Sequence, residues 1–217
     1  MKILITGTAK GIGKATAEYF LDKGHEVAGL DVLGSSIDHM NYTHHIADVS
    51  DENTFPELDG IEVIINNAGV QNCNDIEINL KGTIKISEFY ISRNTRAVVN
   101  VASTSAHTGA EFGEYAASKG GILAYTKNLA SRLAPQGATA NSISPGGVRT
   151  EMNLPVMEDE KLWNQIMDLT PMKKWAEPEE IARWIYFLAV ENKSATGIDI
   201  IVDNGENTCG AKFIWPE

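Results

Sequence analysis

Short apolar runs alternate with longer amphipathic segments along this 217-residue chain. The apolar runs contain few polar interruptions, which is typical of strands buried on both faces of a parallel sheet. We predict helices between them, at 12–23, 76–92, 113–133, 158–168 and 178–190. We predict seven strands, at 2–6, 25–31, 43–48, 61–66, 96–102, 138–144 and 197–203. This alternation indicates one doubly wound α/β domain over residues 1–217, of Rossmann type, with a seven-stranded parallel sheet and helices on both faces.

Composition and charge narrow the possible functions. Hydrophobic residues make up 43% of the chain, enough for one ordinary core, and the net charge is −11. An acidic chain lacks the basic surface that binds nucleic acid or an anionic membrane, so we expect neither partner. The longest apolar run, 184–190, is too short to span a bilayer. We expect a cytoplasmic protein, and a content of only two cysteines, Cys73 and Cys209, fits a reducing compartment.

A glycine-rich turn joins the first predicted strand to the first predicted helix. Gly7, Gly11 and Gly13 lie in the sequence TGTAKGIGK (6–14). Glycines allow a tight turn and a close backbone approach to a pyrophosphate, which the N-terminus of the following helix attracts. Asp31 ends the second strand, where its carboxylate can accept hydrogen bonds from a ribose diol. These features predict a dinucleotide site at the carboxyl ends of the strands.

Tyr115 and Lys119 are four positions apart in the sequence GEYAASKGG (113–121). Residues at this spacing share one face of a helix, and a nearby cation favours the phenolate form of a tyrosine. The pair could therefore act as a general acid and base near neutral pH. The spacing alone does not decide this, because Tyr19 and Lys23 have the same spacing in the first predicted helix.

The order of these motifs along the whole chain resembles that of the short-chain dehydrogenase/reductase family. The matching segments are TGTAKGIG (6–13), LD (30–31), ADVS (47–50), NNAG (66–69), INLKG (78–82), VNVAS (99–103), YAASK (115–119), NSISPGGVRT (141–150) and DNG (203–205). The resemblance implies an NAD(P)-dependent oxidoreductase. It also implies a catalytic tetrad, which would consist of Asn79, Ser103, Tyr115 and Lys119.

The resemblance gives each member of the tetrad a role. Tyr115 would donate a proton to a carbonyl oxygen, or remove one from an alcohol. Lys119 would lower the pKa of Tyr115 and bind the nicotinamide ribose. Ser103 would hydrogen-bond the reacting oxygen, and Thr104 and Ser105 are nearby substitutes for it.

The fourth tetrad member lies where the chain departs from the family. Asn79 would hold a water that links Lys119 to solvent as a proton relay. It follows Asn67 by only 12 positions, a shorter separation than the family usually shows, so Asn74 remains an alternative. A similarly short middle region resembles the bacterial 3α-hydroxysteroid dehydrogenase/carbonyl reductase branch.

The same resemblance places a nicotinamide cofactor along the carboxyl ends of the strands. Asp48 would meet the adenine edge, and Val148 and Thr150 would meet the nicotinamide amide and the phosphates. No metal site is expected, because His44 and His45 are neighbours on one strand and point to opposite faces. The expected cofactor contacts are Gly7, Lys10, Gly11, Ile12, Gly13, Asp31, Asp48, Val49, Asn67, Ala68, Gly69, Tyr115, Lys119, Pro145, Gly146, Val148 and Thr150.

Two residues favour different cofactors. Lys10, beside the glycine turn, resembles a basic residue that family members use for a 2′-phosphate, whereas Asp31 usually accompanies NAD. No Lys or Arg follows Asp31 over 32–40, so a 2′-phosphate would face a carboxylate with little compensation. We therefore expect NAD as the cofactor, with NADP less favoured.

The segment at about 151–175 resembles the mobile lid that covers the substrate in this family. It contains four methionines, whose adaptable side chains suit an apolar ligand, although packing of the lid on its own core explains them equally well. Its acidic cluster at 158–160 would repel a strongly anionic partner such as an acyl carrier protein. The substrate would be a small alcohol or ketone, such as a hydroxysteroid, and we expect four residues near it: Ser105, His107, Met152 and Leu154.

We predict an NAD-dependent oxidoreductase that interconverts a secondary alcohol and a ketone by hydride transfer. A nucleotide-binding regulator without turnover is the alternative, but such a protein would be expected to lose Tyr115 or Lys119. An NADP-dependent carbonyl reductase is a further alternative. By family resemblance, the helices that begin near residues 76 and 113 pair across subunits. We predict a homotetramer, with a dimer as the fallback, because one helix offers apolar residues beyond the needs of one sheet face: Ile122, Leu123, Leu129 and Leu133.

Overall fold

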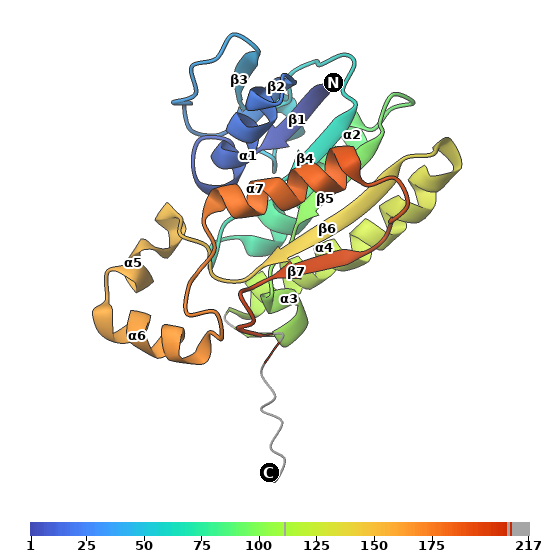
Figure 1. Ribbon diagram of the computed structural model, residues 1–217. Coiled ribbons are helices and arrows are strands. Elements are labelled where there is room, and N and C mark those ends of the chain that lie inside the picture. Colours follow the sequence, from blue (N-terminus) through green and yellow to red (C-terminus); the bar gives the residue numbers. More distant parts are fainter. Residues whose placement is uncertain (111, 208, 210–217) are drawn as a thin grey trace.

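Seven parallel strands form a single sheet in the computed structural model, which describes residues 1–110, 112–207 and 209 (Figure 1). The strand order is β3-β2-β1-β4-β5-β6-β7. The strands are β1 (Lys2–Thr6), β2 (Glu26–Asp31), β3 (Tyr42–Ile46), β4 (Val63–Asn66), β5 (Ala97–Val101), β6 (Thr139–Pro145) and β7 (Asp199–Val202). All seven predicted strands are confirmed, and each end differs from its prediction by two residues at most.

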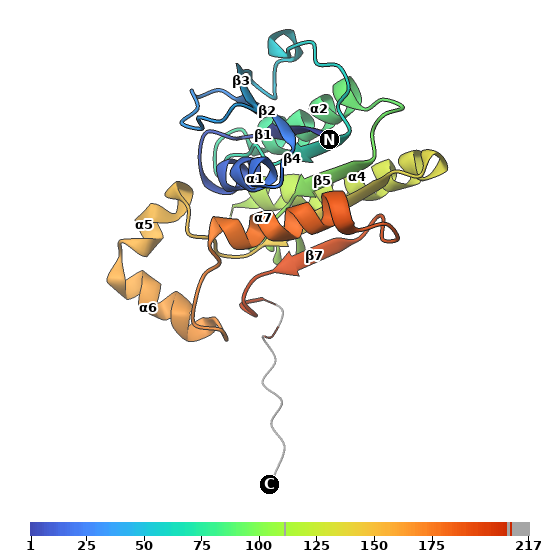
Figure 2. The same cartoon turned by 45° about the horizontal axis from the view of Figure 1, so that its top comes forward.

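Helices connect the strands and cover both faces of the sheet (Figure 2). One face carries α1 (Gly11–Asp22) and α7 (Pro178–Tyr186), and the other carries α2 (Gly82–Tyr90) and α4 (Gly113–Leu133). The other helical segments are α3 (Ser105–Thr108), α5 (Leu154–Met157), α6 (Glu160–Leu169) and the 3₁₀ turns Glu52–Thr54, Ala134–Gln136 and Glu151–Asn153. The predicted doubly wound fold is confirmed. No helix in the described part of the chain is both long and apolar enough to cross a membrane.

Two of the predicted helices change their geometry along their length. The helix predicted at 76–92 begins as a π-helical segment, Ile76–Lys81, before it continues as α2. The helix predicted at 178–190 is regular as α7 and then ends as a π-helical segment, Phe187–Glu191. Short π-helical turns are uncommon and occur frequently at functional sites. The first of them lies on the chain just after β4, where a ligand site is expected in this kind of sheet.

The core forms in two layers because successive residues of a strand point to opposite faces. In β1, Ile3 and Ile5 belong to one apolar cluster together with Phe20 of α1. Leu4, between them, belongs to the other cluster together with Ile86 of α2. All five side chains are completely buried. The sheet is therefore covered on both faces, as its apolar strands predicted.

The segment after β6 leaves the sheet and returns to it as an arm. In Figure 1, α5 and α6 project from the body of the molecule. The two ends of the arm are joined at its base, where Val148 and Ala176 form a parallel bridge. Beside it, Arg149 Nε lies 3.2 Å from the Glu177 carboxylate. The segment expected to act as a substrate lid, 151–175, thus lies between two tethered ends, and its action as a lid stays a prediction.

Most of the apolar residues that suggested a subunit interface are buried within the chain itself. Ile122, Leu129 and Leu133 are buried, with at most 4% of each exposed. Leu123 is the one member of the set that is partly exposed. The idea that all four exceed the needs of one sheet face is wrong, because three of them are buried within the chain and two of these, Leu129 and Leu133, belong to the core on that face of the sheet. The homotetramer stays a prediction that rests on family resemblance.

Candidate active site

A buried ammonium group lies at the carboxyl end of β5. Lys119, in α4, is 5% exposed, and its Nζ donates a hydrogen bond of 3.0 Å to the carbonyl oxygen of Val101. Burial lowers the pKa of Lys119 from 10.5 to about 8, and the carboxylate of Asp75 opposes part of that change. The Nζ atom lies 5.6 Å from the centre of the Tyr115 ring. The structure thus brings the tyrosine and lysine together, with the lysine fixed to the sheet.

The second tyrosine–lysine pair shows what the spacing alone produces. Lys23 Nζ lies 5.3 Å from the ring centre of Tyr19, nearly the same distance as in the first pair. Lys23 is exposed, however, and Tyr19 packs edge-to-face on Tyr186, with 5.4 Å between the ring centres. Tyr19 is therefore a packing residue of α1, and Lys23 is a surface residue at its C-terminal end. Burial of the cation at a strand end is what distinguishes the candidate catalytic pair.

Asn79 joins two parts of the site. It lies in the π-helical segment and is completely buried. Its Oδ1 accepts from the N–H of Val70 (2.8 Å), and its Nδ2 donates to the carbonyl oxygen of Val70 (2.9 Å) and to Ser118 Oγ (3.1 Å). Ser118 Oγ in turn donates to the carbonyl oxygen of Tyr115 (2.7 Å). Asn79 therefore ties the loop after β4 to the helix that carries Tyr115 and Lys119.

Ser103 lies just beyond β5, two residues after Val101, whose carbonyl oxygen accepts the hydrogen bond from Lys119. It is 7% exposed, and its Oγ accepts from the N–H of Ser105 at 3.2 Å. The N–H of Thr104 donates to the carbonyl oxygen of Pro145 (3.0 Å), which ties this segment to the end of β6. Thr104 and Ser105 are also buried, so burial does not separate Ser103 from its two alternatives.

His107 is held at the edge of the sheet. Its Nε2 lies 2.9 Å from Asp199 Oδ2 and 3.3 Å from Ser144 Oγ. Asp199 Oδ1 also accepts from Ser142 Oγ at 2.6 Å, so α3 is linked to β6 and β7. With its Nε2 engaged by Asp199, His107 has a structural role here, and its predicted contact with substrate stays a prediction.

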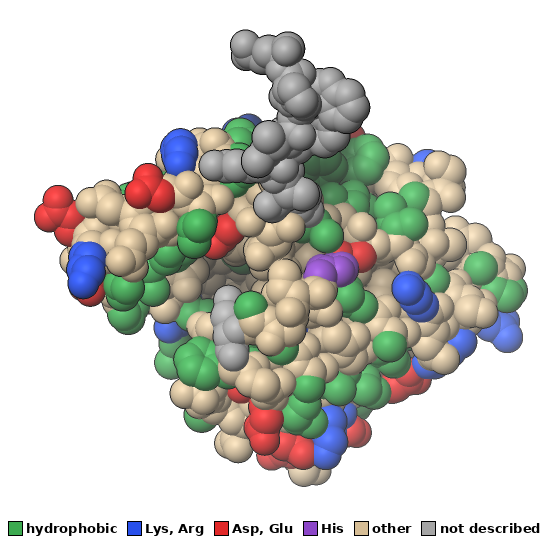
Figure 3. All heavy atoms as spheres, turned by 90° about the horizontal axis from the view of Figure 1, so that it is seen from below, with side chains coloured by type: hydrophobic (Ala, Val, Ile, Leu, Met, Phe, Trp, Pro, Cys, Tyr) green, Lys and Arg blue, Asp and Glu red, His purple; other side chains and the backbone are tan. Residues whose placement is uncertain are grey.

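Figure 3 views the molecule from below, where Lys and Arg side chains lie among acidic and hydrophobic ones.

The glycine turn leaves no room for side chains. A Cβ atom on Gly13 would lie 2.0 Å from the carbonyl oxygen of Gly7 and 2.4 Å from Asn67 Nδ2. Gly7 has a φ of +75°, in the left-handed region that favours glycine. Asn67 braces the turn, because its Nδ2 donates to the carbonyl oxygens of Thr6 (3.0 Å) and Gly7 (3.3 Å). The turn therefore packs too closely on itself and on Asn67 for any residue but glycine at these two positions.

Asp31 is fixed between the glycine turn and the loop after β2. Its Oδ2 accepts from the N–H of Ala9 (2.9 Å), and its Oδ1 accepts from the N–H of Leu33 (2.9 Å). Behind this loop, the Tyr42 hydroxyl lies 2.8 Å from His44 Nδ1, and His44 Nε2 lies 2.8 Å from the carbonyl oxygen of Leu33. The carboxylate is thus held in one orientation at the end of β2.

Known proteins share this arrangement of sequence and fold. The family model described as enoyl-(acyl carrier protein) reductase matches residues 7–207. The chain is a short-chain dehydrogenase/reductase. Carbonyl reductase family member 4 of Xenopus laevis is 31% identical, with 93% of this chain and 95% of that protein covered. The 3-oxoacyl-[acyl-carrier-protein] reductase of Thermotoga maritima is 30% identical, with 93% and 96% covered.

A solved structure gives the same result for the fold. The structure of 4-hydroxyisoleucine dehydrogenase complexed with NADH is 26% identical and has a TM-score of 0.88. The match covers 95% of this chain and 98% of that one. The agreement extends over nearly the whole of both chains.

In this short-chain dehydrogenase/reductase, the other expected cofactor residues also lie near strand ends. Gly146 approaches Asp203 so closely that a Cβ atom would lie 2.8 Å from the Asp203 Cβ. Thr150 reaches the glycine turn, since a Cβ atom on Gly11 would lie 3.3 Å from Thr150 Cγ2. The segments that follow β1 and β6 therefore meet at Gly11 and Thr150. The remaining expected contacts lie at or just after the ends of β1, β3, β4 and β6: Lys10, Ile12, Asp48, Val49, Ala68, Gly69, Pro145 and Val148.

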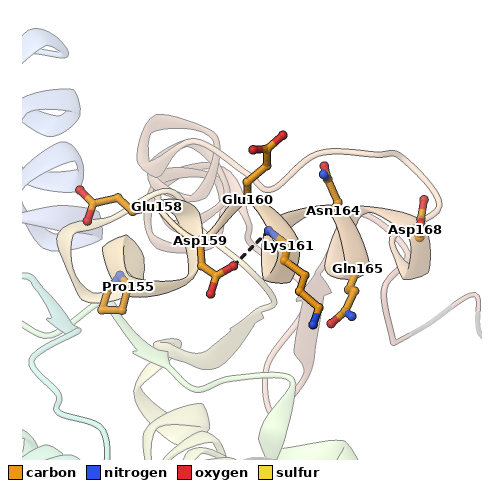
Figure 4. A pocket seen from close by; sticks show the side chains of 8 residues that line it. All are labelled: Pro155, Glu158, Asp159, Glu160, Lys161, Asn164, Gln165 and Asp168. Carbon is orange, nitrogen blue, oxygen red and sulfur yellow. Dashed lines mark hydrogen bonds between the residues drawn. The ribbon is translucent and has the colours of Figure 1, made fainter.

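The arm carries an open depression between α5 and α6, away from the strand ends (Figure 4). Asp159 Oδ1 accepts from the N–H of Lys161 (3.0 Å) and of Leu162 (3.0 Å), so this carboxylate caps α6. The labelled side chains in Figure 4 point in different directions and share no common centre. The expected substrate residues Met152 and Leu154 are 50% and 42% exposed on the same arm, and their contact with substrate stays a prediction.

Two buried residues of this site were missed in the sequence. Ser118 lies inside the YAASK segment, three positions after Tyr115, so its place on the same helix face was available as a signal. Asp75 is 1% exposed, immediately before the π-helical segment. It carried no such signal, because an Asp next to Asn74 normally indicates an exposed turn.

We expect Asn79→Ala to lower the free energy of unfolding by about 1–3 kcal/mol, because it removes the hydrogen bonds to the partly buried N–H and carbonyl groups of Val70 and to the buried Ser118 hydroxyl. Urea unfolding followed by circular dichroism measures this change. Asn74 is exposed and has a φ of +52°. The matched control Asn74→Gly should therefore change the same free energy by less than about 0.5 kcal/mol or stabilise the fold. A larger loss for Asn74→Gly would reverse the assignment of the two asparagines.

Proposed function

We propose that this protein is an NAD-dependent oxidoreductase that interconverts a secondary alcohol and a ketone, with Tyr115 as the general acid and base. The proposal rests mainly on one observation, the position of Tyr115 beside the buried Lys119 ammonium group at the end of β5. The names of its relatives, a carbonyl reductase and a 3-oxoacyl reductase among them, describe the same kind of carbonyl chemistry.

The residues at the glycine turn fit a nicotinamide dinucleotide. Helix α1 begins without a side-chain cap and without an acidic residue in its first turn, so its N-terminal N–H groups and positive dipole end can receive a pyrophosphate. The close approach of Gly13 to the Gly7 carbonyl group holds the start of α1 against the glycine turn. When bound, the cofactor supplies or accepts the hydride, and the protein provides orientation and electrostatics.

The protein's own part in the reaction is the movement of one proton. In reduction, the Tyr115 hydroxyl would donate its proton to the substrate oxygen, and in oxidation the phenolate would remove it. The positive charge of Lys119 favours the phenolate. Ser103 would hydrogen-bond the same substrate oxygen and stabilise the charge that develops on it. Asn79 would keep the loop after β4 in place against the helix that carries both groups.

NAD is the better fit at the end of β2. Each oxygen of the Asp31 carboxylate accepts one main-chain N–H and retains a lone pair for a ribose hydroxyl. A 2′-phosphate here would repel the carboxylate by about 1 kcal/mol in water, and by several times more in a partly buried cleft. Lys10 is exposed, so solvent screens whatever attraction it would offer to that phosphate.

A small molecule is the better fit as substrate. Glu158, Asp159 and Glu160 are exposed on the arm, where their charges would repel the acidic surface of a carrier protein. We therefore favour a free alcohol or ketone over a carrier-bound acyl group. A screen of secondary alcohols, hydroxysteroids and sugars with NAD, followed by NADH absorbance, would identify the class.

We expect Tyr115→Phe to reduce turnover by at least about 100-fold, because it removes the oxygen that carries the proton and keeps the ring. Steady-state rates on the best substrate of the screen measure this, and calorimetric titration with NAD should give nearly the same Kd for the variant and the wild type. Tyr19→Phe is the matched control. A larger loss of turnover in Tyr19→Phe than in Tyr115→Phe would show that the wrong tyrosine is assigned.

We expect wild type to prefer NAD over NADP by at least about tenfold in kcat/KM, the factor that corresponds to 1.4 kcal/mol. Asp31→Ala should shift this preference toward NADP, because it removes the repulsion of the 2′-phosphate and the bonds to the ribose. Rates with both cofactors in both proteins test this. Equal or better use of NADP by the wild type would overturn the assignment.

A further inference from the structure

One buried carboxylate at the site has no part in the reaction described above. Asp75 is 1% exposed and stands directly before the π-helical segment that contains Asn79. Its Oδ1 is buried, and no described residue forms a hydrogen bond with that atom. Burial of a carboxylate oxygen without a partner costs free energy. A nearby positive charge would offset part of that cost.

The interaction available to Asp75 is with the charge of Lys119. Asp75 stands four residues before Asn79, and both Asn79 Oδ1 and Lys119 Nζ lie beside Gly69, where the π-helical segment packs against α4. At this position the field of the Asp75 carboxylate raises the pKa of Lys119. Groups without a fixed charge also lie near Lys119 Nζ, namely the Val101 carbonyl oxygen, Gly69 and the titratable Tyr115 side chain. The next acidic residue along the segment, Glu77, is exposed and pairs with Lys81.

We propose that Asp75 is a positioning residue of this enzyme, whose carboxylate keeps the buried ammonium group of Lys119 charged. The ammonium group can assist Tyr115 only while it carries that charge, so Asp75 acts on the reaction through Lys119. The effect on turnover rests on the proposed function, whereas the effect on Lys119 itself does not.

The direction of the effect follows from two opposing influences on Lys119. Burial lowers its pKa, the Asp75 carboxylate raises it, and the net value is about 8. Loss of the Asp75 charge leaves burial unopposed, so the pKa falls further. Lys119 then loses its proton at a lower pH. Any activity that needs the ammonium group should decline on the alkaline side at that lower pH.

The direct test is an NMR titration of the full-length protein labelled with ¹³C at the lysine side chains, without cofactor or substrate. Lys119→Met identifies the Lys119 signal by its loss. We expect Lys119 to titrate near pH 8 in the wild type and about one pH unit or more lower in Asp75→Asn. Glu77→Gln, which removes the same charge two positions along the chain, should leave the midpoint unchanged. An unchanged midpoint in Asp75→Asn would overturn the proposal.

A pH profile of kcat/KM tests whether the same change in Lys119 affects the reaction. The alkaline limb of Asp75→Asn should move down in pH by the same amount as the NMR midpoint, with the Kd for NAD unchanged. Asp75→Ser serves as a second variant if Asp75→Asn does not fold. A loss of activity that is equal at every pH would show a merely structural role. If the wild type oxidises no alcohol, the proposed function fails, and the NMR result still decides the role of Asp75.

Discussion

The burial of one cation, Lys119, is the constraint on which the site depends. An ammonium group removed from water needs an acceptor, and the carbonyl oxygen of Val101 supplies one just beyond the last residue that β5 pairs with β4. The surrounding residues must then leave room for it. A Cβ atom on Gly69 would lie 3.5 Å from Nζ and 3.1 Å from Asn79 Oδ1, so the loop after β4 passes close to both only because this residue is glycine.

The parallel sheet makes this arrangement possible. All seven strands run in the same direction, so the loops after β1, β2, β4, β5 and β6 all emerge at the carboxyl ends of the strands. The glycine turn, Asp31, Asn79 and the tyrosine–lysine pair therefore gather there from distant parts of the chain. The cation that we propose assists Tyr115 reduces the stability of the fold, since burial disfavours its charged form. Buried charge of this kind is typical of functional sites.

Much of the fold and part of the site could be predicted because the signals are local. Apolar runs such as 2–6 and 61–66 indicate strands without reference to the rest of the chain. The π-helical segment Ile76–Lys81 could not be predicted, because one turn is too short to separate its period from that of an α-helix. The pairing of His107 with Asp199 joins residues 92 positions apart, and the burial of Asp75 depends on how α4 packs.

The most direct test of this account is the free energy of unfolding of wild type minus that of Lys119→Met, measured by urea between pH 7 and 11. Lys119 titrates near 8 when folded and 10.5 when unfolded, so the folded protein bears the whole cost of the charge below pH 8. As the pH rises from about 8 to 10.5, the wild type should gain about 3 kcal/mol relative to the variant. A difference that does not change with pH would show that Lys119 is not a dehydrated cation, and the account of the site would be wrong.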